Sequence, residues 1–293
     1  MPNLPFPLSD DARDHFIAAA LAEDIGSGDL TSSSVIPNEA RLIATMRARE
    51  PMVLSGLPLA CAIFKALDPD VGLQAMADDG TAHQAGSVLL RLNGRARALL
   101  SAERTALNLV QHLSGIATLT HRYVETIKGT GAVILDTRKT TPLLRRLEKY
   151  AVACGGGVNH RMGLYDAVMI KDNHIAVAGG IRPALEAARA AGHDDCQVEC
   201  DTLDQVDEAL AAGAGSLLLD NMAPDLLRRA VARIKGRVPT EASGGVRLET
   251  VRAIAESGVD RISIGRLTQS APAIDIGLDF EQGGTPIMKD HEE

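Results

Sequence analysis

The chain has 293 residues, of which 45% are apolar, so it holds enough apolar material for one large globular domain or two ordinary ones. A formal net charge of −8, the lack of a long Lys/Arg run and an aromatic content of only 2% argue against a nucleic-acid partner. No stretch of about 18 apolar residues occurs, and the N-terminus lacks the basic and apolar regions of a signal peptide, so we expect a cytoplasmic protein without a membrane span.

The N-terminal third has the pattern of a small domain of helices and short strands. Residues 8–24 have helical spacing, and two glycines in the following segment end this helix. A long helical pattern over residues 103–128 connects this part to the rest of the chain. Between these helices, Pro and Gly turns separate short segments. We expect strands at 40–49, 71–76 and 87–93, and a helix at 57–66.

After Gly131 the chain alternates short apolar runs with amphipathic helical stretches. This alternation predicts repeated β-α units and a parallel sheet. The number of units favours a closed or nearly closed α/β barrel, with a doubly wound sheet as the competing architecture. The apolar runs are 132–135, 167–170, 197–199, 216–219, 240–242 and 261–264, and helices are expected at 142–154, 181–191, 203–212, 224–234 and 248–257.

Nearly every apolar run is followed by a polar or glycine residue. In parallel α/β barrels the functional groups collect at the carboxyl ends of the strands, so these residues should surround one pocket. The alternative is that they cap the helices that follow, which would account for Asp201 or Thr202. Capping does not account for Lys171 or Glu199, which we expect to precede loops.

The first candidate site follows the run 132–135. Arg138 and Lys139 lie between this strand and a helix expected to begin at Pro142. Two cations beside a helix N-terminus form a strong anion site, because the helix dipole and the free N–H groups add to the side-chain charge. A solvated basic turn is the alternative interpretation.

Two further clusters supply cations. Three glycines at 155–157 precede His160 and Arg161, and they would let the backbone pass close to a ligand or to another chain. Lys171 follows the run 167–170, and we expect it to point to the pocket mouth because an unpaired buried ammonium is costly. Taken alone, His160 would more often be a structural histidine.

Acids and glycines follow the later strands. Glu199 and Asp220 could hold a divalent cation or the hydroxyls of a sugar, or they could simply balance the nearby cations. The Ser-Gly-Gly stretch at 243–245 and then Gly265 lie where barrels of this kind bind phosphate through backbone N–H groups. Together these positions suit a substrate with several carboxylates and phosphates, assisted by Mg²⁺.

The same residues resemble a known family. The segments 136–145 (DTRKTTPLLR), 155–166 (GGGVNHRMGLYD) and 170–175 (IKDNHI) are similar to those of quinolinate phosphoribosyltransferases, the carboxylating nicotinate-nucleotide pyrophosphorylases. Further similar stretches occur at 23–31, 103–108 and 241–245. The resemblance extends in order over nearly the whole chain, with no departure at a site position.

The resemblance implies a type II phosphoribosyltransferase fold. An N-terminal open-faced α/β sandwich domain, here residues 1–115 with the tail 272–293 returning to it, would precede a seven-stranded α/β barrel, here residues 116–271. It also implies a homodimer, sometimes assembled further, in which Arg104 completes the partner's pocket.

The reaction implied by the resemblance is transfer of phosphoribosyl from phosphoribosyl pyrophosphate to quinolinate with loss of CO₂, as in NAD biosynthesis. Lys139, Lys171, Glu199 and Asp220 are the expected catalytic residues, and the last two would hold ribose hydroxyls and Mg²⁺, directly or indirectly. The expected substrate-binding residues are Arg104, Thr137, Arg138, Lys139, His160, Arg161, Lys171, Glu199, Asp220, Ser243, Gly244, Gly245 and Gly265.

Three other functions compete with this one. A paralogue of the same fold associated with molybdenum transport and a nicotinate phosphoribosyltransferase would share the barrel. The dense set Arg104, Arg138 and Arg161 favours a dicarboxylate over nicotinate. A non-catalytic phosphate-binding barrel would need neither the paired acids nor a lysine suited to pyrophosphate.

Overall fold

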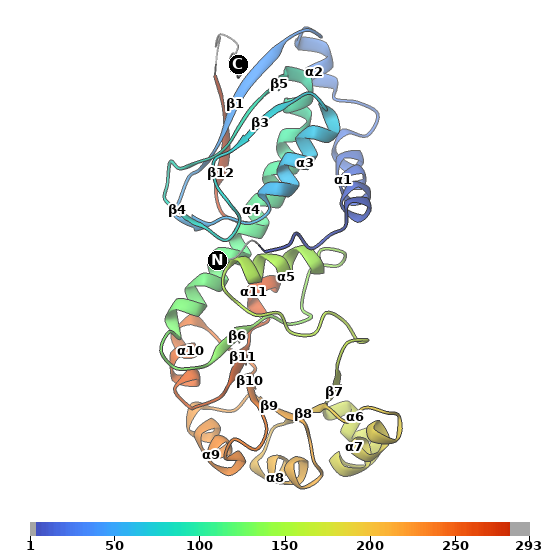
Figure 1. Ribbon diagram of the computed structural model, residues 1–293, viewed down its shortest axis with the longest axis vertical. Helices are drawn as coiled ribbons and strands as arrows, with labels where there is room; N and C mark the ends of the chain where they lie inside the picture. The colour runs from blue at the N-terminus through green and yellow to red at the C-terminus, as the bar shows by residue number, and fades with distance from the viewer. Residues whose placement is uncertain (1–3, 282–293) are drawn as a thin grey trace, which may run out of the picture. The chain divides into compact units, whose positions relative to one another are not determined.

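The computed structural model describes residues 4–281, which form two compact units (Figure 1). The first unit comprises the chain up to Thr118 and again from Pro272, and the second comprises Leu119–Ala271. Among the described residues, no helix has both the length and the apolar character needed to cross a membrane.

An antiparallel four-stranded sheet in the order β12-β1-β5-β3 is the framework of the first unit. Met46 of β1 lies opposite Leu90 of β5, and both side chains are fully buried. One face of the sheet is therefore covered, as is usual for antiparallel sheets. The strands are β1 (Arg41–Ala48), β3 (Gly72–Ala75), β5 (Val88–Arg95) and β12 (Ile276–Glu281), and β2 (Met52–Val53) pairs separately with β4 (Ala82–His83).

Helices α3 (Leu57–Leu67) and α4 (Ala96–Thr126) cover that face (Figure 1). Phe64 of α3 and Leu99 of α4 are among their fully buried side chains. The sequence pattern placed the start of the long helix at residue 103, but α4 begins directly at the end of β5. Two further helices, α1 (Asp10–Ile25) and α2 (Leu30–Val35), precede the sheet in the chain.

The C-terminal segment joins the same sheet, because β12 pairs antiparallel with β1. Arg47 and Arg49 of the β1 region form ion pairs with Asp279 of β12, which add to the backbone pairing. Of the tail expected at 272–293, residues 282–293 lie outside the described residues.

Six parallel strands form the sheet of the second unit, in the order β6-β11-β10-β9-β8-β7. Val198, Leu217 and Ile262 on three of these strands are fully buried, as short apolar runs in parallel sheets require. Helices α8 and α9 lie on the outer side of the curved sheet (Figure 1). The strands are β6 (Val133–Leu135), β7 (Val168–Ile170), β8 (Cys196–Cys200), β9 (Ser216–Asp220), β10 (Thr240–Ser243) and β11 (Arg261–Ser263). The helices are α5 (Arg145–Cys154), α6 (Asp172–Ala178), α7 (Ile181–Ala190), α8 (Leu203–Ala211), α9 (Pro224–Ile234), α10 (Leu248–Ala255) and α11 (Arg266–Gln269).

The seventh strand position of the barrel is reduced to a single bridge. Leu135 of β6 pairs in parallel with Val158, a residue outside the six strands. Val158 N–H donates to the carbonyl oxygen of Ile134 at 2.8 Å, and Asp136 N–H donates to Val158 at 3.3 Å. The segment around Val158 therefore extends the sheet beyond β6.

Two further predictions, one about a helix start and one about a loop, were wrong. The helix expected at Pro142 begins at Arg145, because Leu143 adopts a left-handed conformation with φ 69° that no α-helix accommodates. Arg138 and Lys139 therefore do not lie directly before a helix N-terminus. Conversely, Lys171 does not precede a loop: α6 begins at the next residue.

Candidate active site at the carboxyl ends of the barrel strands

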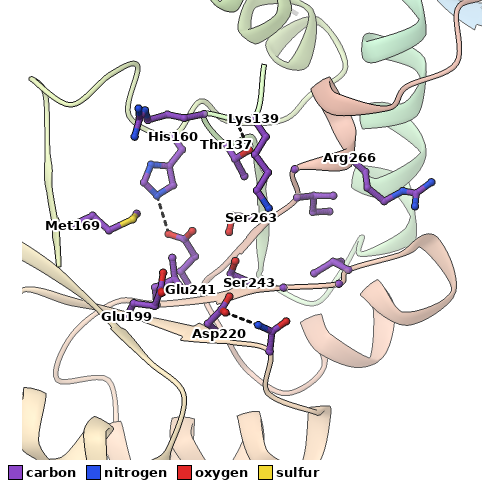
Figure 2. A pocket seen from close by; sticks show the side chains of 18 of the residues that line it. Thr137, Lys139, His160, Met169, Glu199, Asp220, Glu241, Ser243, Ser263 and Arg266 are labelled. Carbon is purple, nitrogen blue, oxygen red and sulfur yellow. Dashed lines mark hydrogen bonds and ion pairs between the residues drawn. The ribbon is translucent and has the colours of Figure 1, made fainter. Parts of the chain in front are cut away.

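A cavity of about 620 Å³ opens at the carboxyl ends of the parallel strands (Figure 2). The structure brings together in its lining every site residue expected from the sequence except Arg104: Thr137, Arg138, Lys139, His160, Arg161, Lys171, Glu199, Asp220, Ser243, Gly244, Gly245 and Gly265. Arg104 lies on α4 in the first unit, where its side chain is exposed.

Four cationic side chains in the lining form what we call the cation wall: Arg138, Lys139, Arg161 and Lys171. Burial, together with the positive charge of Arg138, lowers the pKa of Arg161. Like charges gathered in one pocket repel one another, and a bound anion relieves that repulsion. The electrostatics of the wall therefore favour an anionic ligand.

Lys139 is fixed at both its backbone and its stem. Its N–H donates to Thr137 Oγ1 at 3.0 Å, and its carbonyl oxygen accepts from Thr268 Oγ1 at 2.7 Å. A Cβ atom on Gly265 would lie 2.8 Å from Lys139 Cδ, so the glycine leaves room for the lysine stem. Lys139 thus lies against the last strand end of the barrel.

Lys171 links the cation wall to one of the two acids. Its Nζ lies 2.6 Å from Glu199 Oε2, and the Glu199 side chain is only 11% exposed. The Lys171 backbone N–H donates to His174 Nδ1 at 3.0 Å. His174, for which the sequence suggested no role, is therefore a capping residue for the first turn of α6.

A second part of the lining, which we call the glycine side, consists of Ser243, Gly244, Gly245 and Gly265. Gly244 has φ +94°, and a Cβ atom there would lie 2.1 Å from Asn221 Oδ1. Only glycine fits at this position, because a side chain would meet both backbone strain and a direct clash.

Asn221 connects the second acid to the glycine side. Its Nδ2 donates to Asp220 Oδ2 at 2.5 Å, and its backbone N–H donates to the carbonyl oxygen of Ser243 at 2.9 Å. Asn221 itself has a positive φ of 53°, which asparagine tolerates better than most residues. Asn221 follows its strand as one of the polar residues expected at the pocket, but the sequence suggested no role for it.

A buried ion pair lies beneath the cation wall. Asp136 and Lys149 are at most 1% exposed, and the Lys149 ammonium donates to the Asp136 carboxylate. Asp136 also accepts from Asn159 Nδ2 at 2.7 Å and from the His160 N–H at 2.8 Å, while Lys149 Nζ donates to the His160 carbonyl oxygen at 2.8 Å. Burial raises the pKa of Asp136 and lowers that of Lys149, and the partner's charge opposes both shifts.

The three glycines before this segment have a packing role. A Cβ atom on Gly157 would lie 2.7 Å from Val152 Cγ1 and 2.9 Å from Thr120 Cγ2. None of residues 155–157 lines the cavity. Gly157 thus lets the chain pass close to α5 and α4, whereas the sequence suggested a close approach to a ligand or to another chain.

Several lining residues were missed at the sequence level. The most informative is Glu241 of β10, which is 1% exposed. It lay inside an apolar run and was treated as part of a strand. A charged residue within such a run is itself a signal, because a buried carboxylate needs partners. The others include Met169, Arg247, Ser263 and Gln269.

The acids fit a metal ion that a substrate helps to hold. Among the described residues, no group of three or more His, Cys, Asp or Glu side chains could hold a metal by itself. Glu199 and Asp220 offer two carboxylates in the same cavity. Mg²⁺ commonly keeps several waters and binds one or two carboxylates plus substrate phosphates, so this donor set suits it.

The fold and the cavity together define an α/β-barrel protein whose pocket has the cationic lining expected of a site for an anionic ligand. The family descriptions "Quinolinate phosphoribosyl transferase, N-terminal domain" and "C-terminal domain" match residues 29–114 and 116–279. The chain belongs to the quinolinate phosphoribosyltransferase family.

Individual relatives agree with this assignment over most of their length. A probable nicotinate-nucleotide pyrophosphorylase [carboxylating] of Bacillus subtilis is 47% identical over 88% of this chain and 89% of its own. The nicotinate-nucleotide pyrophosphorylase [carboxylating] of Mycobacterium leprae is 45% identical, covering 92% of this chain and 98% of its own. A solved nicotinate-nucleotide pyrophosphorylase from Francisella tularensis superposes with a TM-score of 0.89 at 38% identity, covering 94% of this chain and 98% of the other.

Proposed function

We propose that the chain transfers the phosphoribosyl group of phosphoribosyl pyrophosphate to quinolinate and releases pyrophosphate and CO₂, which gives nicotinate mononucleotide. The observation that carries this proposal is the presence of the cation wall and the glycine side in one cavity. A dicarboxylate matches the first, and a sugar phosphate matches the second. The names of the relatives describe the same activity.

The cation wall would hold the two carboxylates of quinolinate. Arg138 and Arg161 can each donate two parallel hydrogen bonds to a planar carboxylate, and Lys171 lies beside them with His160 in the same lining. Orienting the ring nitrogen toward the sugar in this way lowers the entropic cost of the bimolecular reaction.

The glycine side would hold the 5′-phosphate through backbone N–H groups, with Glu199 and Asp220 on the ribose hydroxyls. The ring nitrogen then attacks the anomeric carbon as the bond to pyrophosphate breaks, and Lys139 stabilises the departing negative charge. Mg²⁺, when bound with the pyrophosphate, would neutralise further charge on the leaving oxygens. The carboxylate next to the newly positive ring nitrogen then leaves as CO₂, its bonding electrons stay on the ring carbon, and that carbon takes up a proton from water.

We further propose that the protein is a homodimer in which Arg104 completes the partner's pocket. The exposed position of Arg104 on α4 leaves its guanidinium available to a second chain. Mixing Arg104→Ala and Arg138→Ala proteins, each with strongly reduced activity, should raise the activity above that of either protein alone after subunit exchange. No recovery, with exchange verified by mass spectrometry, would contradict the shared pocket.

The reaction itself is tested with purified protein, phosphoribosyl pyrophosphate, Mg²⁺ and either quinolinate or nicotinate. We expect nicotinate mononucleotide from quinolinate and at least about tenfold less from nicotinate, since nicotinate lacks one carboxylate for the wall. Equal turnover of nicotinate would favour the nicotinate enzyme. Binding of phosphoribosyl pyrophosphate without any product would favour the molybdenum-associated paralogue or the non-catalytic barrel. The cytoplasmic location stays a prediction.

A further inference from the structure

Glu241 is a buried acid in a cavity otherwise arranged to bind anions. Its side chain extends from β10 into the lining (Figure 2), and its exposure is only 1%. Oε2 accepts two hydrogen bonds, from Gln197 Nε2 at 2.9 Å and from His160 Nε2 at 3.2 Å. Oε1 is buried and has no hydrogen-bond partner among the described residues.

These contacts favour an ionised Glu241. Burial raises the pKa of Glu241, whereas the hydrogen bonds from His160, Gln197 and Ser263 lower it. A carboxylate that accepts two N–H groups is a stable acceptor despite its burial. Gln197 can donate a hydrogen bond to this carboxylate only when its amide nitrogen, and not its amide oxygen, faces Oε2.

The second ring nitrogen of His160 determines its tautomer. His160 Nδ1 lies 2.7 Å from the backbone nitrogen of Arg161, and that N–H can only donate. Nδ1 must therefore present a lone pair, so the ring proton is on Nε2 and is donated to Glu241. The two hydrogen bonds together require a neutral imidazole in one defined orientation.

Every polar atom of His160 is already used within the fold. Its N–H donates to Asp136 Oδ1 at 2.8 Å, and its carbonyl oxygen accepts from Lys149 Nζ at 2.8 Å. With both ring nitrogens engaged as well, no polar atom remains for a substrate carboxylate. The Arg161 guanidinium has two contacts within the fold: Nη1 donates to the backbone oxygen of Ala167 at 2.9 Å, and Nη2 lies 3.8 Å from Met169 Sδ.

We infer that Glu241 is a positioning residue: through a neutral His160 it fixes the backbone of Arg161, and so it sets the guanidinium that receives a substrate carboxylate. His160 then acts as a strut between Glu241 and Arg161, in place of the direct contact with quinolinate expected from the family resemblance. This inference rests on the proposed function for the identity of the substrate.

The first test compares Glu241→Gln with Glu241→Leu. Because Oε1 has no partner, the amide nitrogen of glutamine can take its place while the carbonyl oxygen keeps both hydrogen bonds. Glu241→Gln should therefore keep the KM for quinolinate within about threefold, whereas Glu241→Leu should raise it by about tenfold or more. The KM for phosphoribosyl pyrophosphate should change little in either variant. Equal damage in both variants would show that the charge of Glu241 matters by itself and would overturn the inference.

A double-mutant cycle shows whether Glu241 acts through Arg161. If it does, Glu241→Leu should add almost nothing to the loss caused by Arg161→Ala, because residues that act as a unit are not additive. Fully multiplicative losses would contradict the inference.

The direct measurement is ¹⁵N NMR of the wild-type protein labelled at its histidines, with the His160 signals assigned by their loss in His160→Gln. We expect the neutral tautomer with the proton on Nε2, both in the free protein and in the quinolinate complex. A proton on Nδ1 in either state would overturn the inference, since Arg161 N–H could then not donate to it. The tautomer of His160 can be measured in the free protein, without any catalysis. A failure of the proposed reaction would therefore not be mistaken for a failure of this inference.

Discussion

The cation wall and the glycine side face one cavity but are built in different ways. Behind the wall, Asp136, Lys149 and Glu241 are buried and hydrogen-bonded to His160, the residue before Arg161. On the glycine side, the absence of a side chain at Gly244 leaves room for Asn221, and its absence at Gly265 leaves room for the stem of Lys139. The cation wall therefore depends on buried, hydrogen-bonded groups behind it, whereas the glycine side depends on positions that lack a side chain.

The largest expected effect comes from breaking the buried pair behind the wall. Lys149→Met leaves Asp136 as a buried acid without its cation, which should lower the free energy of unfolding by about 3–5 kcal/mol. Urea unfolding followed by circular dichroism measures this loss. Adding Asp136→Asn to Lys149→Met should recover part of it, since the uncompensated charge is then removed. If the double variant is no more stable than Lys149→Met, the pair does not act as described.

The next effect concerns the wall itself. Arg138→Ala should lower kcat/KM for quinolinate by about 10- to 150-fold, the equivalent of about 1.5–3 kcal/mol for hydrogen bonds to a charged group. The KM for phosphoribosyl pyrophosphate should stay nearly constant. Arg146→Ala is the matched control, because Arg146 is exposed on the same segment and does not line the cavity. An unchanged kcat/KM for quinolinate in Arg138→Ala would remove Arg138 from the site.

The third prediction compares alanine substitutions at two neighbouring glycines of the glycine side. Gly244→Ala and Gly245→Ala share the strain of a positive φ, but only the first meets a neighbour, Asn221 Oδ1 at 2.1 Å. Gly244→Ala should therefore be less stable than Gly245→Ala by about 1–3 kcal/mol, the usual cost of overpacking. Thermal unfolding of the two variants gives the difference. Equal stabilities would mean that Asn221 moves aside freely and does not define the loop.

The smallest effect is expected at Asp29, an acid that is partly exposed, whereas Asp136 is buried. Asp29 caps α2, and it accepts from Ser32 N–H and from Ser101 Oγ at 2.8 Å each. These hydrogen bonds, those from Ser32 first, lower the pKa of Asp29 from 3.8 to about 2. Asp29→Ala should cost about 1 kcal/mol, as loss of an N-cap usually does.

The pH dependence of this contribution follows from the sign of the shift. Because the folded state has the lower pKa, the stabilisation is complete above pH 3.8 and is lost as the pH falls toward 2. Denaturation of wild type and Asp29→Ala at pH 6 and near pH 2 should show the difference between them shrinking at the lower pH. A difference that stays constant would assign the effect to packing.

Much of the second unit could be predicted because each strand is a short apolar run with a polar or glycine residue after it. The same reasoning failed at Leu143, whose positive φ delays α5 and has no signature in a leucine. It also missed Glu241 and Lys149, since their partners are brought together only by the packed barrel. The functional side chains were therefore visible in the sequence, and their buried supports were not.

The most direct test of the proposed reaction uses quinolinate labelled with ¹⁴C in the carboxylate next to the ring nitrogen, with phosphoribosyl pyrophosphate and Mg²⁺. We expect the wild-type protein to release the label as CO₂ in equal amounts with nicotinate mononucleotide, and Arg138→Ala to lose both together. Retention of the label in a ribosylated product, or no product from folded protein, would contradict the account.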